Sequence, residues 1–420
     1  MSEALPGEGA RKVSFFAGWR AGAGLVAALA VVLSASSLLV QCARQERPVF
    51  EMKPADSIRH PGAEVKRAPQ AGSGTLAGDG VAGPTMSLDP FFKYYEAHPW
   101  PETAERLRAL GFTNALVVFT REIPPDHHRT MLEALHGAGL TVTLRLNPPT
   151  DFEAWEQHPD WRQRMLDGTP GRHDWRVYCC PNNPAFMDYY AGRVAGLMRD
   201  YPYDALLLSE MWFEVWGGAW RNNPVRGRYA CLCDHCVAAF RDRSGADARE
   251  LFNESSPLYF ERPGNNALYR KWVDFRVGSV NAMGRRLAEA ARAARPGLKI
   301  GYMFLADQTV EPGRTREYQA QDLEAAIRAT GAEFVVIQDA WQDWTKPRLS
   351  PRFVHTYADA YLGRIRAVNP AVPVLVHADI GSLPAMKRSK RWMSRTASEA
   401  RRAGFSGVVF YEFTLNLDRY

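Results

Sequence analysis

The chain has 420 residues, of which 46% are hydrophobic and 23% are charged, with only 6 cysteines. These values exclude a disulfide-rich miniprotein, a collagen-like chain and a disordered acidic tail, and they predict a globular protein with a large core. The formal net charge of +6 comes from 52 basic and 46 acidic residues, and the densest basic run, Lys387 to Arg391, is interpreted as a solvated helix face. Because no basic stripe with interleaved aromatic residues accompanies this charge, we predict no nucleic-acid partner.

The N-terminal region has the pattern of a signal peptide or a membrane anchor. The stretch from Ala21 to Val40 carries no charge and follows Arg20. At about 1.5 Å per residue, a helix of this length would just cross a hydrocarbon core, and the preceding positive charges favour a remainder outside the cytoplasm. The segment ending in Cys42 is similar to a bacterial lipoprotein signal, although Gln41 stands where a small residue is expected. A lipoprotein with lipidated Cys42 and an uncleaved anchor both remain open, and in either case we expect an exported, membrane-attached protein.

The composition divides the chain into three parts. Residues 1–43 hold the signal or anchor, and residues 44–84, rich in Pro, Gly and Ala, are predicted to form a disordered linker. Residues 85–420 repeat one unit, an apolar strand followed by a loop, an amphipathic helix and a Gly or Pro stop. The predicted strands are Ala115–Phe119, Val142–Leu146, Ala205–Leu208, Ile300–Leu305, Phe334–Ile337, Val372–Val376 and Val408–Tyr411, with a first strand expected within Thr85–Pro90.

Helices are predicted between the strands, as parallel crossovers require. They are Pro101–Gly111, Arg129–His136, Ala185–Arg199, Leu268–Ala294, Gln319–Thr330, Phe353–Val368 and Arg391–Ala403. This alternation predicts an α/β fold of the (β/α)8 TIM-barrel type, although no covering helix is predicted after the last strand. A doubly wound open sheet is the alternative, and the absence of a Gly-x-Gly-x-x-Gly motif after an early strand counts against it.

Polar residues end several of the predicted strands. In a (β/α)8 barrel the chemistry lies at the carboxyl ends of the strands, so these residues are the candidates for a functional site. They are Arg145 and Asn147, Ser209 and Glu210, Gln338 and Asp339, His377 and Asp379, and Glu412. Aromatic residues follow two of these ends: Trp212, Phe213, Trp216 and Trp220, then Trp341 and Trp344. Such side chains can stack on sugar rings, or alternatively they cap the barrel core.

Four of the cysteines form one pattern, Cys180 followed by Cys231-Leu-Cys233-Asp-His-Cys236. Four thiolates at this spacing can close a tetrahedral structural zinc site, and Cys-x-Cys is too short for an easy internal disulfide. Two disulfides formed after export are the alternative, for which Cys179 is a further candidate, and His235 is a possible substitute zinc ligand. Either arrangement would join the loop after the fourth strand to the loop after the third. No organic cofactor is predicted.

The segment from Trp155 to Arg243 resembles a known family. It contains Asp167-Gly168, Arg176-Val-Tyr178-Cys179-Cys180-Pro181, Glu210 at the end of the fourth strand, and then the Cys-x-Cys-x-x-Cys run. In order and spacing these residues are similar to the zinc-containing clan A glycoside hydrolases, and specifically to the barrel of the family 42 β-galactosidases. The resemblance implies a retaining glycosidase with the acid/base at the end of strand four and a Glu nucleophile at the end of strand seven.

Glu210 matches the acid/base of that family residue for residue, but two positions differ. Ser209 stands where the family has Asn, and Asp379 stands where the family has Glu. Asp is shorter by one carbon, so its carboxylate is withdrawn by about 1.5 Å, and retaining enzymes hold the two carboxylates about 5 to 5.5 Å apart. Galactosidase activity in particular is therefore not predicted.

Glycoside hydrolysis needs one carboxylic acid and one carboxylate. We predict that Glu210 is the acid, because an aromatic mouth with further acids would raise the pKa of Glu210. As the second carboxylate we rank Asp379 first, Glu412 second and Asp339 third. Glu412 or Asp339 would leave room for a water between the two carboxylates, which would make the enzyme inverting. The predicted substrate-binding residues are Arg145, Asn147, Trp212, Trp341 and His377.

Three other hypotheses remain open. Glu210 could form an ion pair with a barrel arginine such as Arg145 and do no chemistry. The whole domain could be a non-catalytic barrel that binds carbohydrate or a partner protein, for which Ser209 and Asp379 are the motivation. An anionic polysaccharide as ligand would require basic side chains in the mouth, where Arg145 is the clear candidate.

Overall fold

The computed structural model of the chain describes residues 83–173, 176–214, 229–306, 312–381 and 387–413. All of them belong to one compact unit, Gly74–Tyr420. The predicted anchor, with Cys42, and the predicted linker up to residue 82 lie outside the described residues. Within the described ranges, no helix is both long enough and apolar enough to span a bilayer.

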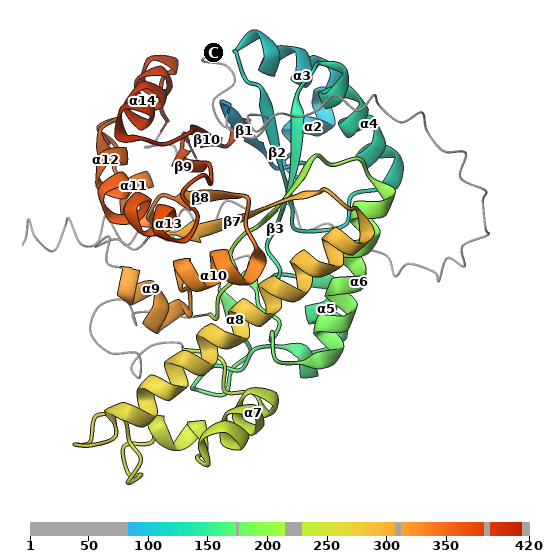
Figure 1. Cartoon of the computed structure of the whole chain (residues 1–420). Coiled ribbons are helices and arrows are strands. Elements are labelled where there is room, and N and C mark those ends of the chain that lie inside the picture. Colours follow the sequence, from blue (N-terminus) through green and yellow to red (C-terminus); the bar gives the residue numbers. More distant parts are fainter. Residues whose placement is uncertain (1–82, 174–175, 215–228, 307–311, 382–386, 414–420) are drawn as a thin grey trace, which may run out of the picture. The chain divides into compact units, whose positions relative to one another are not determined.

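The unit is a closed barrel of eight parallel strands (Figure 1). The strands are β1 Thr85–Leu88, β2 Asn114–Phe119, β3 Thr141–Leu146, β6 Ala205–Leu208, β7 Lys299–Leu305, β8 Phe334–Gln338, β9 Val374–Asp379 and β10 Gly407–Tyr411. The barrel closes where β1 pairs with β10, with Thr85 opposite Val409. The predicted (β/α)8 barrel and its first strand are therefore confirmed, and the open-sheet alternative is wrong.

Alternation along the strands separates two apolar layers. A small inner cluster fills the barrel and consists of Leu116, Ala205, Leu207, Met303, Phe334, Val336, Leu375 and Val409. The larger cluster lies between the strands and the surrounding helices. The inner layer is tight, because a Cβ added at Gly301 would lie 2.3 Å from the Phe334 ring. This parity also directs Arg145, Ser209, His377 and Asp379 to the inside, above the apolar layer.

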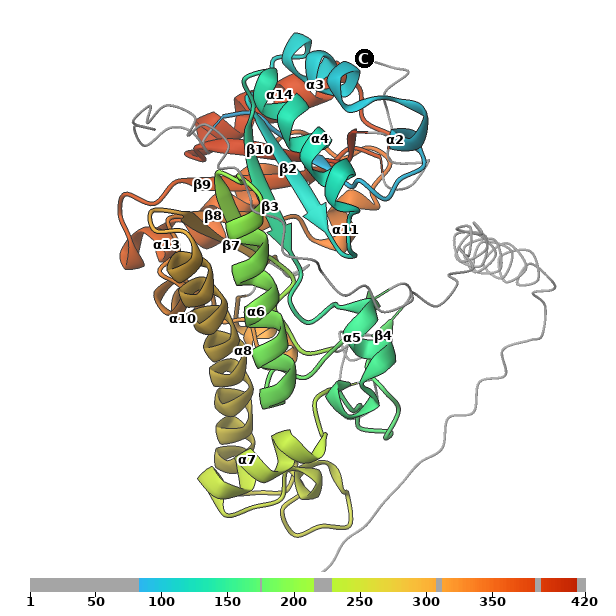
Figure 2. The same cartoon turned by 90° about the vertical axis from the view of Figure 1, so that its right-hand side faces the viewer.

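Helices surround the barrel, and the views in Figures 1 and 2 show α6 and α8 side by side. The α-helices are α2 Tyr94–Ala97, α3 Trp100–Ala109, α4 Pro125–Gly137, α5 Phe152–Gln157, α6 Pro184–Asp200, α7 Asp234–Ser244, α8 Asn266–Ala294, α9 Pro312–Gln319, α10 Leu323–Thr330, α11 Trp341–Trp344, α12 Phe353–Tyr357, α13 Gly363–Val368 and α14 Lys390–Ala403. A π-helical segment, Ala358–Leu362, joins α12 to α13.

One predicted helix is divided by a break in the chain of helical residues. The sequence pattern predicts a single helix over Gln319–Thr330, whereas α9 ends at Gln319 and α10 begins at Leu323. Asp322 caps α10 by accepting a hydrogen bond from the backbone N–H of Ala325 at 3.0 Å. An Asp side chain at this position stabilises a helix start, so the new helix begins there.

Two long loops at the carboxyl end of the barrel position the candidate sites. The loop after β3 carries α5, the 3-10 turn Pro159–Trp161 and the hairpin of β4 Arg172–His173 with β5 Arg176–Val177. The loop after β6 carries α7 and a 3-10 segment, Ala248–Phe252. A backbone bridge between Met165 and Ala230 joins the two loops.

Candidate functional site

Glu210 lies at the carboxyl end of β6, between two guanidinium groups. Its Oε1 accepts a hydrogen bond from Arg145 Nη2 at 3.2 Å, and its Oε2 accepts one from Arg176 Nε at 3.0 Å. The Glu210 and Arg145 side chains are almost completely buried. The ion pair with Arg145 that one hypothesis anticipates is therefore present, and the β4–β5 hairpin adds a second cation.

The two cations control the ionisation of Glu210. Burial alone would raise the pKa of this carboxyl group, but Arg176 and then Arg145 outweigh burial, so the pKa of Glu210 is lowered. The same carboxylate raises the pKa of Arg176 against the opposing effect of burial. The prediction of a raised pKa for Glu210 is wrong, because two guanidiniums contact its carboxylate.

The backbone explains how the Glu210 side chain reaches these cations. Leu207 and Ser209 face the barrel interior, so strict alternation would direct residue 210 outward. Glu210 instead has a φ of 50°, in the left-handed region that is costly for residues other than glycine. Ser209 Oγ accepts a hydrogen bond from Arg145 Nε at 3.1 Å, which helps to hold the same guanidinium. Strained residues of this kind concentrate at functional sites.

A second buried group joins β8 to β9. His377 Nδ1 lies 2.6 Å from Asp339 Oδ1, and Asp339 Oδ2 accepts the backbone N–H of Asp379 at 3.2 Å. Asp379 Oδ1 accepts the backbone N–H of Gly381 at 2.8 Å. After Arg176 and Arg145, the charge of His377 also contributes to the lowered pKa of Glu210. Around the barrel β7 separates β6 from β8 and β9, so this group lies on another side of the mouth from Glu210.

Glu412, the remaining candidate acid, has a structural environment. It is fully buried, and its Oε1 accepts hydrogen bonds from the Tyr95 hydroxyl and from the backbone N–H of Asp89, each at 3.1 Å. These bonds fasten the segment after β1 to the end of β10. Of the four candidate acids, Glu412 is thus the one with an evident anchoring role.

Several polar atoms around the mouth lack a hydrogen-bond partner among the described residues. They are Asn147 Oδ1, Gln338 Oε1 and His377 Nε2, all from side chains that are at most 8% exposed. Buried polar groups are nearly always paired, and an unpaired one costs about 1–3 kcal/mol. A ligand carrying many hydroxyl groups would supply the missing partners.

The structure describes only some of the aromatic side chains that follow the strand ends. Trp212 is only 2% exposed, so it presents little ring surface for stacking, which favours the core-capping alternative for this residue. Trp341 begins the short helix α11, but its side chain lies outside what the structure describes. Trp216 and Trp220 also lie outside the described residues.

Three contacts of residues near the candidate acids were not predicted from the sequence. Arg176 lies within the quoted motif, but nothing in its spacing indicates that it reaches Glu210. Tyr95 lies in the short helix α2, after β1, and belongs to no recognisable motif. Arg388, placed on a solvated face by composition, is instead buried and donates to the carbonyl of Lys346 at 2.7 Å. Burial lowers the pKa of Arg388, while Asp379 and Asp339 oppose that effect.

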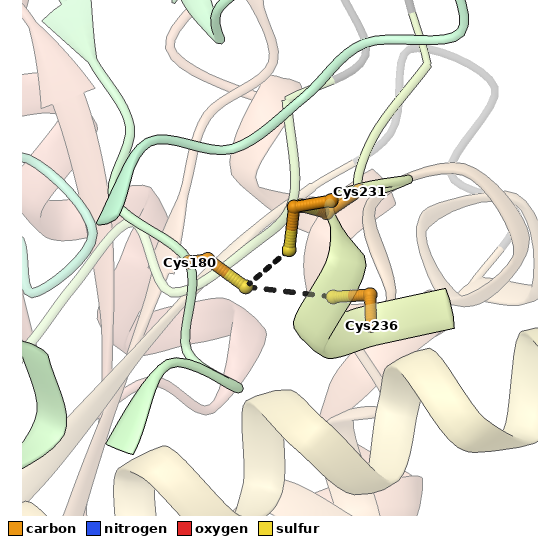
Figure 3. Close-up of side chains that lie close together, drawn as sticks. Cys180, Cys231 and Cys236 are labelled. Atoms are coloured by element: carbon orange, nitrogen blue, oxygen red, sulfur yellow. Dashed lines mark hydrogen bonds between the residues drawn. The ribbon is translucent and has the colours of Figure 1, made fainter. Parts of the chain in front are cut away.

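The four cysteines of the predicted metal pattern come together. The sulfur atoms of Cys180, Cys231, Cys233 and Cys236 lie within 4.8 Å of one another, and all four side chains are buried. Figure 3 shows three of them, with the sulfurs of Cys231 and Cys236 directed toward that of Cys180. The Sγ atoms of Cys180 and Cys236 are 3.4 Å apart, far beyond the ~2.05 Å of a disulfide. The group can hold a metal ion, and the disulfide alternative is wrong for these described residues.

Donors around this cysteine cluster point at the sulfur atoms. Cys231 Sγ accepts the backbone N–H of Arg164 at 3.4 Å, and Cys236 Sγ accepts Asn182 Nδ2 at 3.2 Å. Such N–H donors are typical of thiolates that bind a metal. His235 is exposed and its Nε2 lies 3.1 Å from Asn183 Nδ2, so it is not part of the cluster. Cys179 is buried outside the cluster as well.

A cavity of about 770 Å³ lies beside the cysteine cluster, and its lining includes Arg162, Arg164, Cys233 and His235. Neither Glu210 nor His377 lines it.

No protein-family model and no curated protein sequence matches the chain. Solved structures do share its fold. The PgaB (BpsB) glycoside hydrolase domain from Bordetella bronchiseptica aligns with a TM-score of 0.55 and 12% identity, over 80% of this chain and 95% of that one. A β-galactosidase from the Antarctic haloarchaeon Halorubrum lacusprofundi aligns with a TM-score of 0.57 and 17% identity, over 78% and 52% of the two chains. Gan42B, a GH42 β-galactosidase, aligns with a TM-score of 0.55 and 13% identity, over 80% and 51%.

The chain thus spans about half the length of these galactosidases. At such low identities the likeness establishes a common barrel fold. The chain is accordingly a (β/α)8 barrel whose structural neighbours include glycoside hydrolases.

Proposed function

We propose that the chain is a glycoside hydrolase that works at the carboxyl end of its barrel. The observation that carries this proposal is the environment of Glu210, a buried, strained carboxylate that lies across the mouth from His377, Asp339 and Asp379. A barrel fold shared with glycoside hydrolases supports it. Unpaired polar atoms on Asn147, Gln338 and His377 support a substrate rich in hydroxyl groups, that is, a saccharide.

The charges around Glu210 support a different role from the one that the family resemblance implies. A general acid must hold a proton near neutral pH, and two guanidiniums favour the ionised carboxylate instead. An ionised carboxylate suits attack on the anomeric carbon. In this proposal Glu210 is the nucleophile, Arg145 and Arg176 hold it ionised, and the proton for the leaving oxygen comes from the β8–β9 side of the mouth.

We also propose that the metal held by the cysteine cluster is zinc, in a structural role. Four thiolates at Zn–S distances of about 2.3 Å would stand roughly 3.8 Å apart, close to the 3.4 Å sulfur separations here. All four tetrahedral positions would be filled, so such an ion would bind no substrate. It would instead fix the loop after β3 to the loop after β6.

Export and attachment to a membrane stay part of the proposal, supported by the uncharged stretch from Ala21 to Val40. The substrate would then be an extracytoplasmic saccharide. Fractionation of cells that produce the full chain tests this, since a cytosolic product would contradict it.

The direct test is a screen of aryl glycosides and soluble polysaccharides, with the β-D-galactosides included because several structural neighbours are galactosidases. Glu210→Gln should lower kcat/KM by at least about a thousandfold, since it removes the attacking carboxylate. Glu289→Gln, on the exposed face of α8, is the matched control and should keep full activity. Turnover that survives Glu210→Gln would refute the assignment.

A non-catalytic, saccharide-binding barrel is the second candidate, favoured by the complete pairing of Glu210 with two arginines. It predicts that saccharides bind in calorimetry without being hydrolysed, and that binding persists in Glu210→Gln. Turnover by the wild-type protein excludes it.

A further inference from the structure

His377 has the geometry of a proton-transfer group. Its Nδ1 lies 2.6 Å from Asp339 Oδ1, and both side chains are at most 4% exposed. Asp339 is itself oriented, because its second oxygen accepts the backbone N–H of Asp379 at 3.2 Å. The carboxylate is an acceptor only, so the hydrogen of this bond is on Nδ1 of the imidazole. Asp339 therefore determines which ring nitrogen is left for other partners.

The other ring nitrogen faces no protein partner. His377 Nε2 is buried and lacks a hydrogen-bond partner among the residues described. His377 lies on β9 with the same parity as Leu375, which faces the inside of the barrel, so its ring is directed toward the interior that Glu210 also borders at the end of β6. A buried imidazole with one nitrogen fixed by a carboxylate and the other open is the arrangement that enzymes use for proton transfer.

We propose that His377 Nε2 is the acid/base of this barrel, with Asp339 as its positioning residue. This inference rests on the proposed glycosidase function and goes beyond it by naming the group that moves the proton. It also replaces the substrate-binding role that the sequence predicts for His377.

In the first step the Glu210 carboxylate bonds to the anomeric carbon, the glycosidic C–O bond breaks, and its electron pair stays on the leaving oxygen. That oxygen takes the Nε2 proton of the imidazolium, so a neutral alcohol leaves. In the second step a water attacks the anomeric carbon and gives its proton to Nε2, while the ester electron pair returns to Glu210. The two inversions retain the anomeric configuration.

Leaving-group dependence tests this role, because a good leaving group needs no proton. The probes are 2,4-dinitrophenyl and methylumbelliferyl glycosides of a sugar that the wild-type protein hydrolyses. In His377→Gln, kcat/KM for the methylumbelliferyl glycoside should fall by at least about a hundredfold. For the dinitrophenyl glycoside it should fall by less than about tenfold, and azide should restore kcat by attacking the glycosyl-enzyme without a base.

Two further variants test the positioning residue and provide a control. Asp339→Asn should show the same leaving-group pattern with a smaller loss, since the imidazole stays but its orienting carboxylate is gone. His355→Gln is the matched control: this His also contacts a carboxylate, Glu399 at 2.8 Å, but on the outer helices α12 and α14. His355→Gln should leave kcat/KM for both glycosides unchanged. Melting temperatures of all variants report whether each one is folded.

The possible results separate the two proposals. Equal losses on both glycosides in folded His377→Gln would overturn the acid/base role and leave the glycosidase function intact. Absence of turnover by the wild-type protein on every saccharide tested would refute the glycosidase function, and the role of His377 with it.

Discussion

The barrel mouth and the cysteine cluster are two buried polar regions with opposite chemical character. In the cluster, sulfur atoms contact one another and accept N–H donors such as Asn182 Nδ2. At the mouth, Glu210 is held by cations, yet nearby Asn147 and His377 keep buried atoms that no described residue satisfies. A buried region whose polar atoms are paired within the protein is suited to a structural role. A buried region whose polar atoms lack protein partners is suited to binding a ligand.

One short segment links the two regions. Arg176, which contacts Glu210, lies in the hairpin that leads directly to Cys180. The backbone N–H of Cys180 is bonded to Trp161 O at 2.7 Å, so this segment is anchored at the cluster end. A substitution that disrupts the cysteine cluster should therefore also affect the barrel mouth, because it displaces Arg176. A substitution at the mouth should leave the cysteine cluster unchanged.

The largest effect is expected from Cys233→Ser. It removes one of the four sulfur atoms proposed to hold zinc, and structural zinc sites contribute about 10–16 kcal/mol of binding free energy in small zinc peptides. We expect the free energy of unfolding to fall by several kcal/mol, on the order of 5, together with loss of bound zinc and of activity. Elemental analysis measures the bound zinc, and urea unfolding measures the free energy of unfolding. A variant that keeps its stability would show that the cluster is not a structural metal centre.

Cys179→Ala is the control for that experiment. Cys179 is as buried as the ligands but stands outside the cluster. It should retain zinc at the wild-type ratio, with a loss in stability of only about 1 kcal/mol.

Arg176→Met should have a smaller effect, because Arg145 still neutralises Glu210. Removing a partner of a buried charge costs about 3–5 kcal/mol when nothing replaces it, and with Arg145 in place we expect about 2 kcal/mol at pH 7. The zinc content should not change. Loss of zinc in this variant would contradict the one-way link between the two regions.

The same variant has a pH signature. The pKa of Glu210 is lower in the folded protein than in the unfolded chain, so its ion pairs stabilise the fold above the ordinary Glu pKa of about 4.3. That stabilisation is lost as the pH falls below about 4.3 and through the folded-state pKa. Arg176→Met should lose less stability over this acid range than the wild-type protein does. Unfolding curves at pH 7 and pH 3.5 measure this difference. Equal losses of unfolding free energy in the two proteins would contradict the proposed effect of Arg176 on Glu210.

The barrel was predictable because its signals are local. Apolar strands such as Phe334–Gln338 alternate with helices at regular intervals, and a polar residue at a strand end must face the mouth or the solvent. The cysteine cluster was predictable from spacing, since tetrahedral coordination restricts which cysteines can meet.

The electrostatics of the site were not predictable from the same patterns. The contact between Arg176 and Glu210 depends on how the β4–β5 hairpin folds over the mouth, and no local pattern encodes that fold. The left-handed backbone at Glu210 carries no composition signal either, since glycine is the usual residue there. For these reasons the strand-end acid was located correctly but the direction of its pKa was not.

In the proposed mechanism Glu210 is the carboxylate that bonds to the anomeric carbon. Incubation with a 2-deoxy-2-fluoro glycosyl fluoride of a hydrolysed sugar, followed by peptide mass spectrometry, measures this directly. We expect one glycosyl adduct per chain, on the peptide that contains Glu210. An adduct on the peptide that contains Asp379 would contradict it.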